Sequence, residues 1–134
     1  MQNKNSITLV PDGASHAAVQ AFLEQLLEAD GVALRIQSRM QVVTDEIWSN
    51  IVRYSGASQA SLELYGAETT LFLRFTDNGR PYDPTAAPEP DITLPADKRA
   101  IGGLGLHMVR EMTTSMMYHY NGGQNRLTLG FARS

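Results

Sequence analysis

The sequence predicts an α+β fold, a two-layer sandwich with a mixed, mostly antiparallel sheet and helices on one face. Three segments have apolar residues spaced three and four apart, as in helices that are buried on one side. Other segments alternate apolar and polar residues, as in paired strands, and two of these pairs are joined tightly enough for hairpins. Hairpins mixed with helices favour an antiparallel sheet covered on one face. With 134 residues, we expect a single domain over 1–134.

The first part of the chain is expected to contain one strand and two helices. Residues 6–11, SITLVP, read as a short strand that Pro11 ends. A helix is expected within 13–31, with Ser15 as N-cap and Gly31 as the C-terminal stop. Its predicted buried stripe is Val19, Phe22, Leu26 and Ala29. A second, core-facing helix within 35–55 follows from the spacing of Ile36, Met40, Val43, Ile47, Ile51 and Tyr54.

The second part is expected to contain four strands and one helix. Residues 60–67 and 69–77 alternate around Leu62, Leu64, Leu71, Leu73 and Phe75, and read as a hairpin. Residues 80–101 hold five of the six prolines and no periodicity, which indicates a long loop with a function of its own. A helix follows, with Leu106, Val109 and Met112 on its apolar side. Residues 116–132 read as a closing hairpin that turns at 121–125.

Composition excludes several classes of function. The net charge of −3 and a pI near 5.5 argue against a nucleic-acid partner. The chain has no cysteine, and His16, His107 and His119 lack metal-ligand spacing. No segment has the length of a membrane span or a secretory signal, so we expect no membrane partner and a cytoplasmic protein.

Glu46 and Asn50 lie four residues apart in the second predicted helix, at the border of its apolar stripe. Magnesium prefers oxygen ligands and retains waters, so Asn50 together with nucleotide phosphates is sufficient to hold it. Glu46 is then one turn from the metal, where it can act as a general base toward a hydroxyl. From spacing alone, an ordinary solvated helix face is the commoner explanation.

Asp77 continues the buried row of its strand, Leu71, Leu73 and Phe75, so the alternation places a carboxylate on the apolar face. A buried carboxylate needs a hydrogen-bond donor, and the exocyclic amine of adenine is one. Gly79 would allow a flat ring close to the backbone. Alternatively, Asp77, Asn78 and Gly79 simply form a turn.

Residues 101–112, IGGLGLHMVREM, place Gly102, Gly103 and Gly105 at the start of a predicted helix. Glycines let a phosphate approach the backbone, and a helix N-terminus offers free N–H groups and a positive dipole end. A glycine cluster alone also fits a flexible loop. The order of the three motifs is more specific than any one of them.

In this order the motifs resemble the GHKL (Bergerat-fold) ATP-binding domains of histidine kinases and gyrase B, and most of all the small anti-sigma-factor serine/threonine kinases. Residues 45–55, DEIWSNIVRYS, resemble the N box. Residues 77–84, DNGRPYDP, and 102–112, GGLGLHMVREM, resemble the two glycine boxes. The likeness extends from about Ile7 to Phe131.

The resemblance implies an ATP-binding β-α-β sandwich and a role for each motif. Asn50 would coordinate magnesium, Asp77 would contact adenine, and Gly79 would lie beside the ring. Glu46 would activate a seryl or threonyl hydroxyl of a protein substrate. The nucleotide would also contact the glycine run, Gly102, Gly103, Leu104, Gly105 and Leu106, with Gly103 and Gly105 lining the phosphates.

The partners implied are a STAS-type anti-sigma-factor antagonist and a sigma factor, and a homodimer stays open. The chain departs from the pattern at Thr114, where relatives often have an acidic residue. Their arginine lies nearer the glycine run than Arg99, so a phosphate contact by Lys98 or Arg99 is undecided. Three classes of function remain: a kinase, which the Glu46 carboxylate favours, a nucleotide-dependent module that sequesters its partner, and a domain that binds no nucleotide.

Overall fold

The computed structural model describes residues 5–86 and 103–133, without the side chains of 103 and 104. The described strands form a five-stranded sheet in the order β1-β2-β3-β5-β4. They are β1 (Ser6–Leu9), β2 (Ala60–Gly66), β3 (Thr70–Asp77), β4 (Ser115–Asn121) and β5 (Gln124–Ala132). The helices are α1 (Ser15–Ala29), α2 (Leu34–Asn50) and α3 (Gly103–Met112), with a one-turn 3-10 helix, η2, at Pro84–Ala86.

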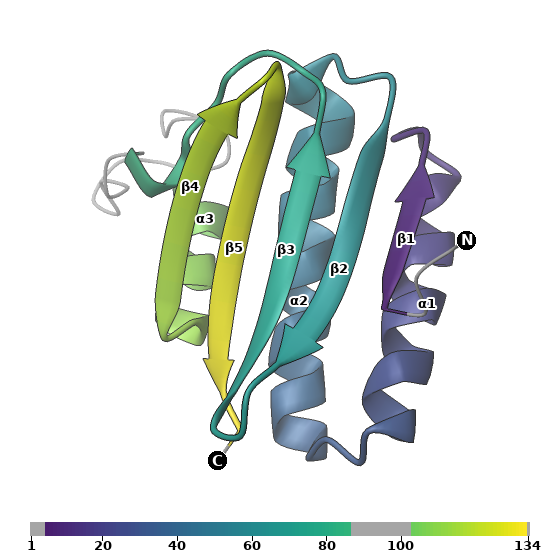
Figure 1. Cartoon of the computed structure of the whole chain (residues 1–134), viewed down its shortest axis with the longest axis vertical. Helices are drawn as coiled ribbons and strands as arrows, with labels where there is room; N and C mark the ends of the chain where they lie inside the picture. The colour runs from purple at the N-terminus through teal and green to yellow at the C-terminus, as the bar shows by residue number, and fades with distance from the viewer. Residues whose placement is uncertain (1–4, 87–102, 134) are drawn as a thin grey trace.

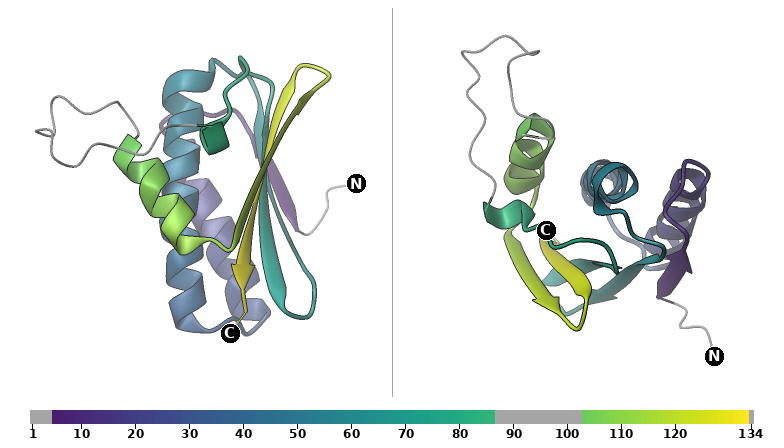
Figure 2. Two further views of the ribbon diagram at one scale, coloured as in Figure 1. Left: turned by 90° about the vertical axis from the view of Figure 1, so that its left-hand side faces the viewer. Right: turned by 90° about the horizontal axis from the view of Figure 1, so that it is seen from above.

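The α+β sandwich predicted from the sequence is confirmed. Figures 1 and 2 show α1, α2 and α3 behind one face of the twisted sheet, while the other face is uncovered. The expectation of a mixed sheet was too broad, because every pairing between described strands is antiparallel. None of the described helices is both long and apolar enough to cross a membrane.

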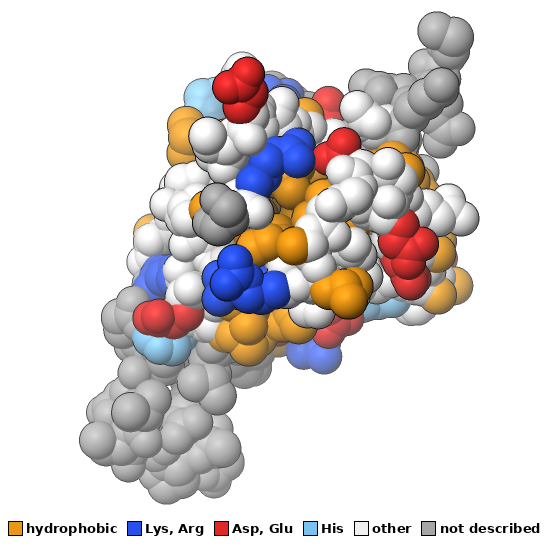
Figure 3. Space-filling model, turned by 90° about the horizontal axis from the view of Figure 1, so that it is seen from below, with side chains coloured by type: hydrophobic (Ala, Val, Ile, Leu, Met, Phe, Trp, Pro, Cys, Tyr) orange, Lys and Arg blue, Asp and Glu red, His pale blue; other side chains and the backbone are white. Residues whose placement is uncertain are grey.

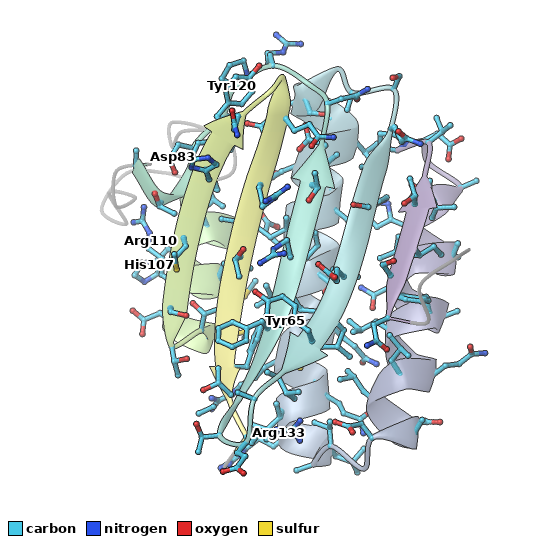
Figure 4. All side chains as sticks on the ribbon, in the orientation of Figure 1. Tyr65, Asp83, His107, Arg110, Tyr120 and Arg133 are labelled. Carbon is cyan, nitrogen blue, oxygen red and sulfur yellow. The ribbon has the colours of Figure 1, made fainter. Side chains whose placement is uncertain are left out.

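The core lies between the sheet and the helices. The predicted alternation of β2 and β3 is confirmed, because Leu62, Leu64, Leu71, Leu73 and Phe75 are all buried. On the uncovered face, the Tyr65 ring stacks on Phe72 with centroids 5.1 Å apart, and the Arg74 guanidinium lies 4.9 Å from the Tyr65 centroid. Tyr65 is labelled on this face in Figure 4. Apolar side chains thus fill one face of the sheet, and a polar and aromatic row occupies the other.

The predicted stripe and cap of α1 were wrong in part. Its buried apolar residues are Val19, Leu23 and Leu27, whereas Phe22 and Leu26 are half-buried and Ala29 is exposed. Ser15 is the first helical residue rather than the N-cap. Asp12 makes the capping contacts instead, because its Oδ1 accepts hydrogen bonds from the N–H groups of Ala14 and Ser15. Gly31 has φ of 67°, so the predicted C-terminal stop is confirmed.

Helix α2 is followed directly by a π-helical turn, Ile51–Ser55. The Ser55 hydroxyl donates to the Ile51 carbonyl at 2.7 Å, and Gly56 ends the turn in the left-handed conformation with φ of 66°. The predicted stripe is buried from Ile36 to Ile51, but Tyr54 is 37% exposed. A π-turn shifts the helical phase, which explains why the spacing rule failed at Tyr54.

The closing hairpin is confirmed, with its turn at Gly122 and Gly123, which both have positive φ. Of the long loop predicted over 80–101, residues 87–101 lie outside the described residues. The described part after β3 continues through Tyr82 to η2 and lies beside β4. Residues 79–86 are called the outgoing segment below.

Candidate functional site

A cavity of about 440 Å³ opens where α2 and its π-turn meet the ends of β3 and β5. Its lining combines apolar side chains of the core with polar groups from β3, β4, β5 and the outgoing segment. The lining residues are Ile47, Asn50, Ile51, Arg53, Tyr54, Ser55, Phe75, Asp77, Arg80, Pro81, Tyr82, Pro84, Tyr118, Asn125 and Leu127. An apolar hollow with a few converging polar groups is the usual form of a small-molecule site.

Asp77 lies at the end of β3 with its side chain in this cavity, and it is only 7% exposed. Its Oδ1 accepts hydrogen bonds from the Gly79 N–H at 2.9 Å and from Asn125 Nδ2 at 3.1 Å. Among the described residues, no hydrogen bond goes to Oδ2. The turn predicted as the alternative is therefore present, and the same carboxylate still has an acceptor oxygen for a ligand.

Asn125 is a polar residue of the site that sequence analysis missed. It pairs with Asp77 across β3 and β5 and is 6% exposed. We assigned it to the hairpin turn, yet the buried row of β5, Leu129 and Leu127, runs directly onto it. The same period-two argument that identified Asp77 could have found Asn125, had the turn been placed two residues earlier.

Gly79 lies against the backbone of Ser55. A Cβ atom at position 79 would overlap the Ser55 carbonyl oxygen and lie 2.7 Å from Ser55 Cβ. The Arg80 N–H also donates to the Ser55 carbonyl at 2.9 Å. The end of β3 and the π-turn after α2 are thus held in close contact, which fixes one wall of the cavity.

Glu46 and Gly105 are brought together although they are far apart in the sequence. Glu46 is half-buried on α2, and a Cβ atom at position 105 would overlap its carboxylate. The first turn of α3 therefore lies directly against the Glu46 carboxylate. The structure does not support a fully solvated helix face for Glu46, because Gly105 covers part of it.

Asn50 lines the cavity one turn beyond Glu46, at the end of α2. Among the described residues, no side chain or backbone group forms a hydrogen bond with its carboxamide. The described residues contain no group of three histidine, cysteine or acidic side chains able to hold a metal alone. The donors present therefore fit a magnesium ion held by one amide oxygen together with phosphate oxygens and waters.

Two tyrosines at the cavity are held in their neutral form. Burial raises the pKa of Tyr82, Tyr54 and Glu46 raise it further, and Arg110 opposes the shift. Burial also raises the pKa of Tyr118. Figure 4 shows Asp83 and Arg110 at the same edge of the molecule, and Arg110 Nη2 donates to the Pro84 and Thr85 carbonyls at 3.3 Å each. Helix α3 thereby holds the outgoing segment.

The remaining predicted site residues are distributed as follows. Gly102, Lys98 and Arg99 lie outside the described residues, and Gly103 and Leu104 belong to the first turn of α3. Leu106 is 2% exposed and belongs to the core. Thr114 lies after α3 has ended, where its N–H donates to the Gly130 carbonyl at 2.8 Å. Individual nucleotide contacts of these residues stay predictions.

A second cavity, of about 320 Å³, lies at the opposite end of α2. The view in Figure 3 shows hydrophobic side chains between arginines at this end of the molecule. The cavity is lined by Arg35, Ile36, Arg39, Glu111, Met112, Thr113, Thr114, Phe131 and Ala132. None of the residues predicted to bind nucleotide lines it.

The fold and the first cavity define an α+β domain with a small-molecule site. Sequence comparison identifies the family to which this domain belongs. The model of the histidine kinase-like ATPase domain matches residues 9–131, and the chain belongs to this family. It is similar to the serine/threonine-protein kinase BtrW of Bordetella bronchiseptica, with 30% identity over 112 residues, covering 81% of this chain and 79% of BtrW. The likeness to the GHKL anti-sigma kinases expected from the motifs is confirmed.

Solved structures share the fold at low sequence identity. One contains the RsbU and RsbW domains of a Mycobacterium tuberculosis protein, with TM-score 0.63, 14% identity and coverage of 96% of this chain and 33% of that chain. Another is the Acinetobacter baumannii histidine kinase AdeS, with TM-score 0.53, 17% identity and coverage of 73% and 47%. The chain thus spans between a third and a half of these two proteins, so the comparison concerns one domain of each.

Proposed function

We propose that this chain is an ATP-dependent serine/threonine protein kinase of the anti-sigma-factor type, which phosphorylates a STAS-type antagonist. The observation that carries the proposal is the Asp77 carboxylate, buried in an apolar cavity with Oδ2 free of hydrogen bonds among the described residues. Family membership and the similarity to a serine/threonine kinase support it.

In this proposal the base of ATP enters the first cavity between the apolar side chains of Ile51, Phe75 and Leu127. The exocyclic amine of adenine donates to Asp77, whose other oxygen is already held by Gly79 and Asn125. Guanine presents a carbonyl at the corresponding position, which would oppose the carboxylate. Asp77 therefore favours adenine over guanine.

The phosphates are directed toward the first turn of α3, where backbone N–H groups and the helix dipole favour an anion. Magnesium bound at Asn50 would neutralise charge on the phosphates and orient them. Glu46 lies between these features, one turn from Asn50 and in contact with Gly105. The acceptor hydroxyl must therefore approach beside Glu46.

In the transfer step the oxygen of the protein substrate's hydroxyl attacks the γ-phosphorus of ATP. The bond between that phosphorus and the bridging oxygen of ADP breaks, and the hydroxyl proton passes to the Glu46 carboxylate. The products are a phosphoserine or phosphothreonine and ADP. Glu46 is the group that separates this proposal from a sequestering module, because binding alone requires no base.

Incubation with labelled ATP and a STAS-type protein to which the chain binds tests this proposal. We expect wild type to transfer phosphate and Glu46→Gln to bind ATP with unchanged affinity but transfer about 100- to 10,000-fold more slowly. Glu46→Gln keeps the side-chain contact with Gly105, whereas Glu46→Ala removes it. Comparing the two variants therefore separates loss of the base from loss of this contact. Asn50→Ala is expected to lose magnesium-dependent binding as well.

Two results would reject the kinase assignment. One is equal transfer by wild type and Glu46→Gln, and the other is no transfer to a STAS-type protein that wild type demonstrably binds. In the second case a nucleotide-dependent sequestering module would replace the kinase.

A further inference from the structure

Asn125 connects more parts of the site than any motif residue does. Its Nδ2 donates to Asp77 Oδ1 at 3.1 Å and to the Arg80 carbonyl at 2.8 Å. Its Oδ1 accepts from the Tyr82 N–H at 3.0 Å and from the Tyr118 hydroxyl. One buried side chain on β5 thus contacts the end of β3, the outgoing segment and β4.

We infer that Asn125 is a positioning residue that holds the Asp77 carboxylate and the outgoing segment as one unit, coupling base binding to the placement of Tyr82. This inference deepens the proposed function and rests on it. It assigns Asn125 no contact with the reacting atoms.

The carboxamide is suited to this role because it donates and accepts at the same time. A carboxylate in its place could accept from Tyr82 and Tyr118 but could not donate to Asp77 or to the Arg80 carbonyl. An apolar side chain would remove the hydrogen bonds that Asn125 makes to the Tyr82 N–H and the Arg80 carbonyl, in a region that is only 6% exposed at Asn125. Burying a polar group without its hydrogen-bond partner is unfavourable.

The coupling reaches toward the proposed base through the outgoing segment. Asn125 holds this segment at Arg80 and Tyr82, and Arg110 of α3 holds it at Pro84 and Thr85. Tyr82 belongs to the anchor made by Asn125, and the Glu46 carboxylate contributes to the raised pKa of Tyr82. A shift of Asn125 therefore alters the position of a tyrosine whose electrostatic surroundings include Glu46.

Asn125→Asp tests the inference, because it keeps the shape of the side chain, replaces the donor by an acceptor and adds a negative charge beside Asp77. At a pH where Asp77 and the introduced aspartate are both ionised, two carboxylates face each other. We then expect magnesium-ADP to bind about 10- to 100-fold more weakly to Asn125→Asp than to wild type. Close carboxylates share a proton, so the pKa of the pair is raised. At low pH that proton lets the introduced carboxyl donate to Asp77, and the deficit relative to wild type should shrink.

The other titratable and charged groups around the pair do not produce this pattern. They are Arg53 and Tyr54 after α2, Arg80, Tyr82 and Asp83 in the outgoing segment, and Tyr118 and Tyr120 on β4. The raised pKa values keep Tyr82 and Tyr118 neutral between pH 5 and 8. All of them, Asp83 included, are also present in wild type, so the comparison with wild type cancels their contribution.

Calorimetric titration with magnesium-ADP at pH 5 and pH 8 measures the effect on binding. Asn121→Asp is the matched control, because it introduces the same charge on an exposed residue of the same hairpin. It should bind as wild type does at both pH values. A deficit in Asn125→Asp that is absent at pH 8, or is equal at both pH values, would overturn the inference.

Hydrogen exchange in the nucleotide-free protein provides a second measurement. At pH 8 the amides of Arg80, Tyr82, Asp83 and Thr85 should exchange faster in Asn125→Asp than in wild type. The amides of α1 and β2 should exchange equally and show that the variant is folded. Unchanged exchange at 80–85 would overturn the inference. If wild type failed to bind ADP, the proposed nucleotide function would fall, and this measurement would still decide whether Asn125 holds the outgoing segment.

Discussion

Single buried polar residues locate the candidate site and also support the fold. Asp77 and Asn125 face each other because β3 and β5 pair in a register that places their last inward positions opposite one another. Between α1 and α2, Trp48 is fully buried, and its Nε1 donates to Ser15 Oγ at 2.7 Å. Ser15 Oγ in turn donates to the Asp12 carbonyl at 2.5 Å. The second set of contacts joins α1 to α2.

Ser15→Ala is expected to destabilise the protein by about 1–3 kcal/mol, because it leaves the buried Trp48 N–H without its acceptor. Urea unfolding followed by Trp48 fluorescence measures the change, since Trp48 is the single tryptophan. Ser38→Ala is the matched control on the exposed side of α2, where alanine has the better helix propensity and should cost nothing. Equal stabilities of the two variants would contradict the role assigned to Ser15.

The polar residues also mark where sequence reasoning succeeded and where it failed. Asp77 was predictable, because strict alternation leads from Phe75 onto it. Asn125 follows from the same rule. It was assigned to the turn because the glycines at 122 and 123 led us to predict a turn that extended to position 125. Ser15 was expected as a cap from its residue type, yet nothing in the sequence indicates that Trp48, 33 residues away, would be its partner.

At the scale of elements, two glycines make the contacts that bring the motifs together. Gly79 brings the end of β3 against the π-turn after α2, and Gly105 brings α3 against Glu46 on α2. The two contacts differ in what a side chain would meet. A Cβ atom at 79 would meet the Ser55 backbone, whereas one at 105 would meet the movable end of Glu46.

Gly79→Ala is therefore expected to destabilise the fold by about 1–3 kcal/mol, because backbone must shift to admit the methyl group. Gly105→Ala should cost less, since the Glu46 side chain can rotate away. Gly13→Ala is the control, because no atom lies within 4 Å of its added Cβ, and it should be neutral or slightly stabilising. Thermal unfolding of the three variants checks this ranking, and a Gly79→Ala protein as stable as Gly13→Ala would show that the close approach is unimportant.

The elements themselves were largely predictable, and their exact phase was less so. The stripe of α2 and the rows of β2 and β3 followed from spacing, because each faces the core along its whole length. In α1 the rule selected Phe22 and Leu26, whereas the helix turns Leu23 and Leu27 inward. An apolar-rich helix such as QAFLEQLL offers more than one plausible stripe, and only packing against α2 and the sheet chooses between them.

At the scale of the whole molecule, the antiparallel sheet and its helical layer bring residues of two motifs, Asn50 and Asp77, to one cavity, and bring Gly105 of the third motif against Glu46. The order of motifs predicted this assembly through resemblance, and the fold and family confirm the class of domain. Spacing alone could not predict it, because contacts such as that of Glu46 with Gly105 depend on how α3 crosses α2. The second cavity, between the start of α2 and the end of α3, shows that this helical layer also forms a hollow away from the motifs.

The central claim is that ATP binds in the first cavity through Asp77, and calorimetry with magnesium-ATP tests it most directly. We expect wild type to bind, and Asp77→Asn to bind about 10- to 100-fold more weakly, because the amide offers the adenine amine a donor in place of an acceptor. Asp45→Asn, whose side chain is 65% exposed on α2, should bind as wild type does. No binding to wild type, or equal binding to wild type and Asp77→Asn, would contradict the claim.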